Sequence, residues 1–146
     1  MPQGTERRRE ARLYLDTSAY LCILLGEDGS ARLSRQTEGA ELLSSVLLVL
    51  EARRNLIRLA REGTLAGGRY KTVLDRLEQD VARFTLRDVT LELCQSIRMP
   101  AVATPRTLDL AHLRTALWFH AAEKIDRFVT LDAAQEVAAQ ELGLPV

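Results

Sequence analysis

Four acidic residues end apolar runs in this chain of 146 residues, and carboxylates in such places can do chemistry. They are Asp16 in LYLDTSAYL, Glu51 in LLSSVLLVLEARR, Asp109 in TLDLAHLRTAL and Asp132 in FVTLDAAQEVAAQELG. Because an isolated charge beside a buried run is costly, four such acids predict one shared partner. The natural partner is a hard divalent cation, Mg²⁺ or Mn²⁺, which prefers oxygen ligands. Water on such an ion, activated by a carboxylate, is a nucleophile for a phosphodiester.

Two of the acids follow expected strands. The apolar run Leu13 to Leu15 predicts a strand that stops at Asp16, and Arg127 to Thr130 predicts a strand that ends just before Asp132. In open parallel α/β sheets, ligands bind beyond the carboxyl ends of the strands. We therefore expect Asp16 and Asp132 to lie at the same edge of one sheet.

The other two acids fall in expected helices. Thr107 is a suitable cap for a helix that carries Asp109 in its first turn. Ser45 can cap a long helix that reaches about Glu62, with Glu51 in its second turn. Asp109 can then lie at the same sheet edge, and the longer Glu51 side chain can reach it.

Hydrophobic periodicity predicts the remaining elements. After Thr17 and Ser18 as cap residues, we expect helices at Ala19 to Leu25, Gly29 to Thr37, Leu65 to Asp80, Val89 to Ile97 and Ala133 to Leu142. We expect further strands at Glu41 to Ser44, Phe84 to Leu86 and, at an edge, Leu144 to Val146, with a loop from Pro100 to Thr107. Strands that alternate with helices predict an α/β fold with a parallel sheet covered on both faces.

Each acid also has an ordinary structural interpretation. The two acids that follow strands can simply cap the next helix, and Asp109 can favour the dipole of its own helix. Glu51 can pair with a neighbouring arginine, either Arg53 or Arg54. The common context of the four acids, rather than any one of them, points to a single site.

Two ring side chains near Asp109 have competing interpretations. His112 lies within a turn of Asp109 and can border the pocket, but a solvated helix position is favoured. Trp118 can stack on a base, but a contact in the core or in a dimer is favoured. His112 and His120 have no third ligand in view, which disfavours a metal role for them.

Composition limits the possible classes of protein. Lys plus Arg is 20 and Asp plus Glu is 20, so the net charge is zero and binding of long duplex nucleic acid receives no support. Cys22 and Cys94 lack zinc-site spacing and are expected to be buried thiols. No secretory signal or membrane-spanning run is visible, so we expect a cytoplasmic protein with no membrane partner. Residues 1–11 are expected to form a flexible arm, and residues 12–146 one domain.

These motifs together resemble the PIN-domain family, and most closely the VapC-type toxins of type II toxin–antitoxin systems. The resemblance extends from Leu13 to Val146, and its most specific part is FVTLDAAQEVAAQELGLPV. It implies a three-layer α/β/α sandwich with a short parallel sheet, and a Mg²⁺-dependent endoribonuclease. It also implies three partners, which are an RNA substrate, a cognate antitoxin and a second copy of the chain.

The resemblance carries specific roles to specific residues. Asp16, Glu51, Asp109 and Asp132 would be the catalytic, metal-binding acids, with Ser18 and Thr130 as polar side chains around them. Asp126 matches a position that is often acidic in the family, but a structural role is favoured. We further expect Arg53, Arg54 and Arg114 to hold the RNA backbone.

Three other interpretations remain open. The chain can be a non-catalytic PIN-like module that binds RNA or protein, or a housekeeping nuclease that processes RNA. A phosphatase-like or nucleotide-binding α/β domain is disfavoured, because Gly67 and Gly68 form no phosphate-binding loop.

Overall fold

The computed structural model describes residues 8–95, 99–103 and 106–146, which form four strands and seven helices. The strands are β1 (Arg12–Leu15), β2 (Glu41–Ser45), β3 (Phe84–Arg87) and β4 (Arg127–Val129). The helices are α1 (Thr17–Leu25), α2 (Ser30–Thr37), α3 (Leu47–Arg61), α4 (Gly68–Val81), α5 (Leu91–Gln95), α6 (Thr107–Ala122) and α7 (Ala133–Glu141).

The four strands form one parallel sheet in the order β3-β2-β1-β4. In the register of the sheet, Tyr14 of β1 pairs with Leu43 of β2 on one side and with Phe128 of β4 on the other. The chain adds β2 and β3 on one side of β1 and then returns to add β4 on the other side. The strand order therefore reverses between β1 and β4, the kind of place where α/β sheets bind ligands.

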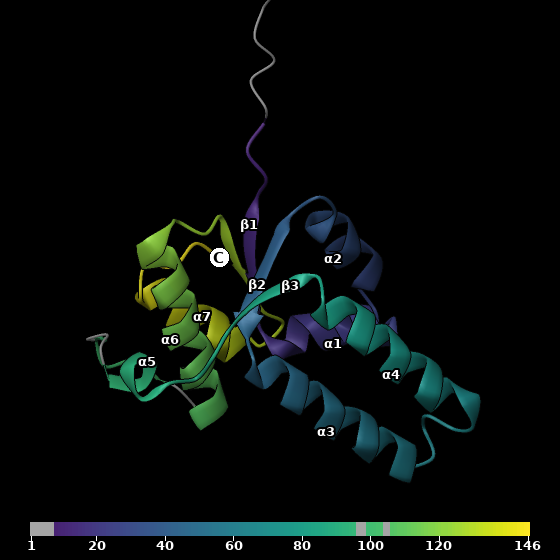
Figure 1. The fold of residues 1–146 in the computed structure, drawn as a ribbon. Coiled ribbons are helices and arrows are strands. Elements are labelled where there is room, and N and C mark those ends of the chain that lie inside the picture. Colours follow the sequence, from purple (N-terminus) through teal and green to yellow (C-terminus); the bar gives the residue numbers. More distant parts are fainter. Residues whose placement is uncertain (1–7, 96–98, 104–105) are drawn as a thin grey trace, which may run out of the picture.

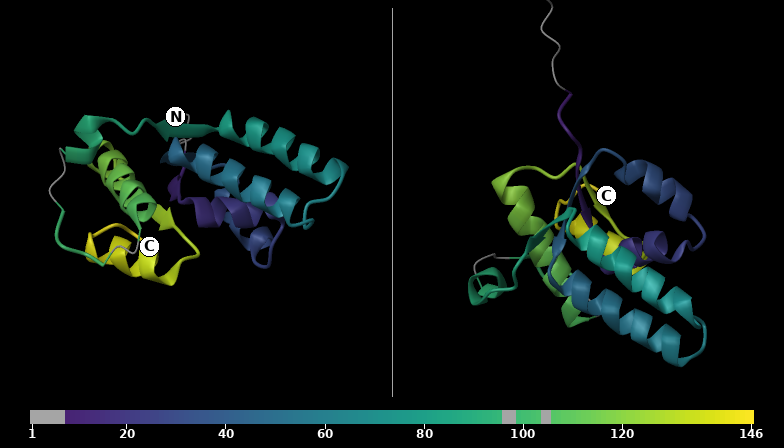
Figure 2. Two further views of the ribbon diagram at one scale, coloured as in Figure 1. Left: turned by 90° about the horizontal axis from the view of Figure 1, so that it is seen from below. Right: turned by 45° about the vertical axis from the view of Figure 1, so that its right-hand side comes forward.

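Helices cover both faces of the sheet, as Figures 1 and 2 show. Because side chains alternate along a strand, Tyr14 faces one way and its neighbours Leu13 and Leu15 face the other. Tyr14 packs in a buried cluster with residues of α6 and α7, including Leu113. Leu13 and Leu15 pack with residues of α1 and α2, including Leu33. The predicted α/β fold, with a short parallel sheet between two helical layers, is confirmed.

Helices α3 and α4 form an antiparallel pair that extends away from the sheet (Figure 1). A third buried cluster fills the space between this pair and α1, and it contains Leu48, Leu56 and Leu77. The cluster anchors the start of α3, which carries Glu51, against the body of the domain.

Several expected element boundaries are wrong. Leu144 to Val146 is not a strand; the Phe128 N–H donates to the Pro145 carbonyl at 2.6 Å, but Pro145 has no N–H with which to continue a ladder. The helix expected at Val89 to Ile97 is α5, which begins at Leu91. The end expected for it lies outside the described residues, as do positions 104–105 of the predicted loop.

The helix caps also differ from expectation. Asp16, rather than Thr17 or Ser18, caps α1, because Asp16 keeps an extended backbone while Thr17 is already helical. Thr107 is the first residue of α6 rather than its cap, and the cap position belongs to Arg106. Ser45 closes β2, and its hydroxyl accepts a hydrogen bond from the Leu47 N–H at 3.2 Å. The cap position of α3 is Val46.

The two cysteines have different environments. Cys22 is buried in α1, as expected, whereas Cys94 is exposed on α5. The expectation of two buried thiols is therefore wrong for Cys94, because α5 is a short helix that buries only Leu93.

The described part of the N-terminal arm contacts the domain. Arg9 lies 3.6 Å from the Asp126 carboxylate, and Asp126 also accepts the Arg12 N–H at 2.7 Å. Residues 1–7 of the expected arm lie outside the described residues. Within residues 8–95, 99–103 and 106–146, no helix has both the length and the apolarity needed to cross a bilayer.

Candidate functional site

Asp16 lies where the strand order reverses, directly after β1. Its N–H donates to the Val129 carbonyl of β4 at 3.1 Å, which joins the carboxyl ends of the two strands. The side chain caps α1 through Oδ1, which accepts the Ala19 N–H at 3.1 Å and the Ser18 hydroxyl at 2.6 Å. Asp16 is only 4% exposed. Burial raises its pKa, and the hydrogen bonds from Ser18, Thr130 and Ala19 act in the opposite direction.

Two hydroxyls tie the end of β1 to the segment that follows β4. Thr130 donates to Asp16 Oδ2 and accepts the Asp132 N–H at 3.1 Å. Ser18 donates to Asp16 Oδ1, lies 3.3 Å from the Thr130 hydroxyl and accepts the Leu131 N–H at 3.0 Å. The structure thus brings Ser18 and Thr130 to the Asp16 carboxylate, where hydroxyl donors support its negative charge.

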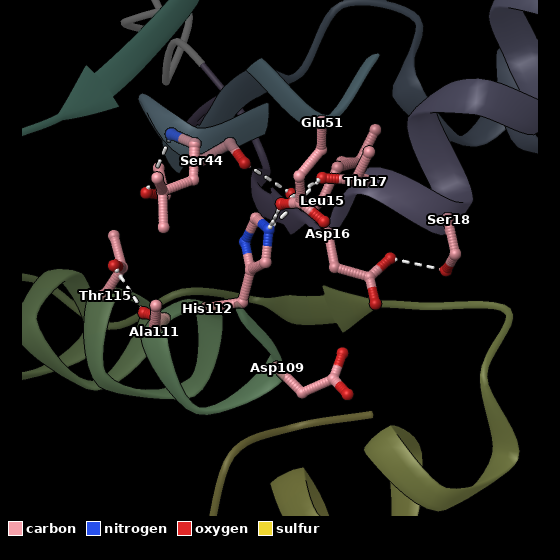
Figure 3. A network of polar contacts seen from close by, with 12 residues as sticks. Leu15, Asp16, Thr17, Ser18, Ser44, Glu51, Asp109, Ala111, His112 and Thr115 are labelled. Carbon is pink, nitrogen blue, oxygen red and sulfur yellow. Dashed lines mark hydrogen bonds and ion pairs between the residues drawn. The ribbon is translucent and has the colours of Figure 1, made fainter. Parts of the chain in front are cut away.

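Glu51 reaches the same region from α3, and its side chain is 20% exposed. Its Oε1 accepts the Thr17 hydroxyl at 2.9 Å and lies 2.8 Å from His112 Nε2 (Figure 3). The alternative pairing of Glu51 with Arg53 or Arg54 is wrong: among the described residues its ion-pair partner is His112, and Arg53 lies 3.4 Å from Glu78 of α4. Glu51 is instead fixed by residues of α1 and α6.

His112 is a buried part of the site, and the expectation of a solvated helix position is wrong. It is 2% exposed, because this face of α6 packs on the sheet around Tyr14. Its Nδ1 lies 2.8 Å from the Tyr14 hydroxyl, and its Nε2 faces Glu51. The spacing of three residues from Asp109 puts His112 on the same side of α6 and was a signal for this position.

Asp109 completes the group from the first turn of α6. Figure 3 shows its carboxylate directed toward that of Asp16, with no hydrogen bond drawn to it. Partial burial raises the pKa of Asp109, and the charges of Asp132, Asp16 and Glu51 raise it further, while Arg106 opposes them. Repulsion among like charges requires that they lie near one another. The charges of Asp132, Asp16 and Glu51 thus act on Asp109, although the four acids are far apart in sequence.

Asp132 is exposed and caps α7, accepting the Gln135 N–H through Oδ1 at 3.0 Å. The ordinary capping interpretation of Asp132 is therefore correct, and it does not prevent a second role. The Gln135 side chain is fully buried and donates from Nε2 to the Asp109 carbonyl at 2.9 Å. Gln135 thus links the start of α7 to the start of α6. Its Oε1 is buried without a hydrogen-bond partner among the described residues.

Sequence reasoning missed the roles of Tyr14, Gln135 and Arg106 at this site. Gln135 follows Asp132 by three residues, a spacing typical of the residue that donates to a helix cap. In the sequence Tyr14 lies within an apolar run, and nothing nearby distinguishes it from an ordinary core side chain. Its contact with His112 spans 98 residues of sequence and exists only in the folded chain.

The donor set has the chemistry that Mg²⁺ or Mn²⁺ prefers. The facing groups of Asp16 and Asp109 are carboxylates, and a cation between them would relieve the repulsion that raises the pKa of Asp109. Over the described ranges, no three His, Cys, Asp or Glu side chains already form a group that could hold a metal. Mg²⁺ is usually bound by one or two carboxylates and several waters, so two facing acids suit it.

The three arginines expected to contact RNA differ in environment. Arg53 and Arg54 are exposed on α3, and Arg53 is partly engaged by Glu78. Arg114 is half-buried in α6. Trp118 is also half-buried and packs with Phe119. The Arg87 guanidinium carbon lies over the Trp118 ring, 4.3 Å from the ring centre.

A pocket of about 540 Å³ opens elsewhere, beside α1, α2 and α4. Leu42 and Phe84 are among its apolar lining residues, and Arg35 and Arg83 are among its charged ones. None of the four acids lines it, so this pocket is separate from the candidate site.

No known protein-family model matches the chain, and no curated protein matches its sequence.

Proposed function

We propose that this protein is a metal-dependent endoribonuclease of the PIN-domain type, acting as the toxin of a type II toxin–antitoxin pair. The observation that carries the proposal is the buried Asp16 carboxylate beside the reversal of strand order. Asp109 supports it, because burial and then the charges of the other three acids raise its pKa. An enzyme that brings polyanionic RNA to an acidic site needs a cation there, which connects the acids to phosphodiester chemistry.

Asp16 and Asp109 would hold Mg²⁺ or Mn²⁺, with Glu51 and Asp132 beside them. When bound, the ion supplies a water of lowered pKa and positive charge next to the phosphate. Ser18 and Thr130 hold the Asp16 carboxylate in place by donating to both of its oxygens.

Binding of the substrate would come from basic residues around the acids. Arg53, Arg54 and Arg114 would contact RNA phosphates, which position a nucleic acid without reading its sequence. In this proposal the protein acts in the cytoplasm, where its RNA substrate is found.

The protein partners in this proposal are a cognate antitoxin and a second copy of the chain. Three leucines that precede acids of the site, Leu50, Leu108 and Leu131, are exposed and would offer apolar surface to such a partner.

The proposal is tested with purified protein and a mixed pool of structured and single-stranded RNA. We expect cleavage with Mg²⁺ or Mn²⁺ and none in EDTA, and loss of cleavage and of growth arrest in Asp16→Asn and Asp109→Asn. Asp75→Asn is a matched control, because Asp75 is exposed on α4 and pairs with Lys71, four residues earlier on the same helix. Cleavage at the wild-type rate in EDTA would remove the metal mechanism. A folded protein that binds metal and RNA without cutting would favour a non-catalytic binding module instead.

A further inference from the structure

A chain of three side chains, of which Tyr14 and His112 are buried, connects the sheet to Glu51. Tyr14 of β1 is 0% exposed, and its hydroxyl lies 2.8 Å from His112 Nδ1. On the other side of the ring, His112 Nε2 lies 2.8 Å from Glu51 Oε1. The three residues come from β1, α6 and α3, so the chain joins three separate elements at the site.

The directions of the hydrogen bonds follow from the chemistry of each partner. An ionised carboxylate only accepts hydrogen bonds, so the nitrogen that faces Glu51 Oε1 must carry a proton. The Thr17 hydroxyl already donates to the same oxygen at 2.9 Å. Its own oxygen lies 3.2 Å from His112 Nε2 and can accept a share of the same N–H. The proton of a neutral His112 therefore sits on Nε2.

The other ring nitrogen then needs a donor, and Tyr14 is suitably placed to provide one. The hydroxyls of Ser44 and Thr115 also lie beside the Tyr14 hydroxyl. They donate to the carbonyls of Leu15 and Ala111, each at 2.7 Å, so their protons are used elsewhere. Burial raises the pKa of Tyr14, so its hydroxyl keeps its proton. Nδ1 of His112 accepts that proton in a hydrogen bond.

We propose that Tyr14 and His112 are positioning residues: the Tyr14 hydroxyl donates to Nδ1 and so supports the Nε2–H form of His112, and that N–H holds the Glu51 carboxylate at the acidic site. Glu51 projects from helix α3, and its flexible side chain needs such a restraint to stay in one rotamer. Partners of this kind fix ring orientation and ligand geometry in known metal sites. The catalytic consequence rests on the proposed nuclease function, whereas the form of the ring rests on geometry alone.

The first measurement is the ¹⁵N spectrum of the histidine side chains, which distinguishes the two neutral forms and the cation. The chain has only two histidines, and the signals lost in His112→Gln are those of His112. We expect a protonated Nε2 and an unprotonated, hydrogen-bonded Nδ1 at neutral pH, and in Tyr14→Phe an Nδ1 signal that moves to that of an unprotonated nitrogen without a hydrogen bond. A protonated Nδ1 in the wild-type protein would overturn the proposal, whether or not the protein cuts RNA.

Tyr20→Phe is the matched control for the loss of one buried tyrosine hydroxyl. The Tyr20 hydroxyl donates to Asp80 at 2.8 Å in the cluster between α1, α3 and α4, away from His112. We expect this variant to leave the His112 signals and RNA cleavage as in wild type. If Tyr20→Phe changes the His112 spectrum as much as Tyr14→Phe does, support of this form by Tyr14 is refuted.

The second measurement separates kcat from KM for RNA cleavage. We expect Tyr14→Phe and His112→Leu to lower kcat by about tenfold or more with little change in KM, as loss of a ligand's supporting partner does. His112→Gln keeps an N–H donor for Glu51 and should retain more activity than His112→Leu. If all three variants are folded, as thermal unfolding can show, and cleave RNA at the wild-type rate, the positioning role is overturned.

The design keeps the two proposals distinguishable. If the wild-type protein does not cleave RNA under any metal, the nuclease proposal fails, and the ¹⁵N spectrum still decides which form His112 takes. If His112→Leu does not fold, the comparison of Tyr14→Phe with Tyr20→Phe still decides whether Tyr14 acts through the ring.

Discussion

Replacement of Asp109 by asparagine tests whether the four acids repel one another in the folded protein. The charges of Asp132, Asp16 and Glu51 all raise the pKa of Asp109. The group is partly open to solvent, so each repulsion is screened to about 0.5 kcal/mol, as for surface charge pairs. An acid in the first turn of a helix favours the dipole by about 0.5 kcal/mol, which Asp109→Asn loses. The attraction of Arg106, also about 0.5 kcal/mol, is lost as well. The metal-free variant should therefore be more stable by about 0.5 kcal/mol, or roughly 1–2 °C in Tm.

The gain in stability of Asp109→Asn over wild type depends on pH, because the folded state raises the pKa of Asp109. Between the pKa of the unfolded chain and the higher pKa of the folded state, the folded protein binds more protons at Asp109. The stability due to the protonated carboxyl is present below about pH 4 and is lost as the pH rises through the folded pKa. The advantage of Asp109→Asn should therefore be absent in acid and complete at neutral pH.

Bound metal should make the wild-type protein more stable than Asp109→Asn. A ligand at one hundred times its Kd stabilises the folded state by about 2.7 kcal/mol, more than the repulsion it relieves. Thermal unfolding should thus give Asp109→Asn a higher Tm than wild type in EDTA and a lower Tm than wild type in excess Mg²⁺. The control Asp75→Asn should lose a few tenths of a kcal/mol with its helix pair and show no such reversal. A lower Tm for Asp109→Asn in EDTA at neutral pH would refute the shared acidic site.

Three further predictions concern the residues that hold the site. Thr130→Val removes the donor to Asp16 and should cost about 1–2 kcal/mol in urea unfolding, whereas Thr130→Ser should cost much less; equal losses would contradict a role for the hydroxyl. Gln135→Met loses the donor to the Asp109 carbonyl together with a buried oxygen that has no partner among the described residues, so calorimetry should show weaker Mg²⁺ binding with nearly unchanged Tm; unaltered binding would argue against the link. Arg12→Met removes a nearly buried guanidinium from its acidic partners and should lower stability by about 2–3 kcal/mol without affecting Mg²⁺ binding, as calorimetry can check.

The fold class was accessible from sequence because its signals are local. The apolar runs at Leu13 to Leu15 and Arg127 to Thr130, separated by helical periodicity, indicated strands buried between helices. The order β3-β2-β1-β4 was not accessible, because pairing of strands depends on contacts between distant segments. Local signals also failed at the last three residues, where a single hydrogen bond to Pro145 took the place of a strand.

Side-chain type alone does not identify which residue caps a helix. Asp16, Thr17 and Ser18 are consecutive, and all three residue types are good caps. Only the backbone decides among them: Asp16 has φ −79° and ψ 173°, so the helix starts one residue later. That difference matters for the site, because the capping side chain is the buried acid.

The sequence by itself determined most of the segments that form strands and helices, and that an acid stands at or near the end or start of four of them. Only the tertiary structure decided where those acids point. Glu51 lies beside two arginines in sequence, yet it bonds to His112, 61 residues away. His112 has the polarity of a surface residue but is buried, because α6 turns that face toward Tyr14 of the sheet. Local propensity acts over a few residues, whereas the partner of a buried polar group is chosen by packing of the whole domain.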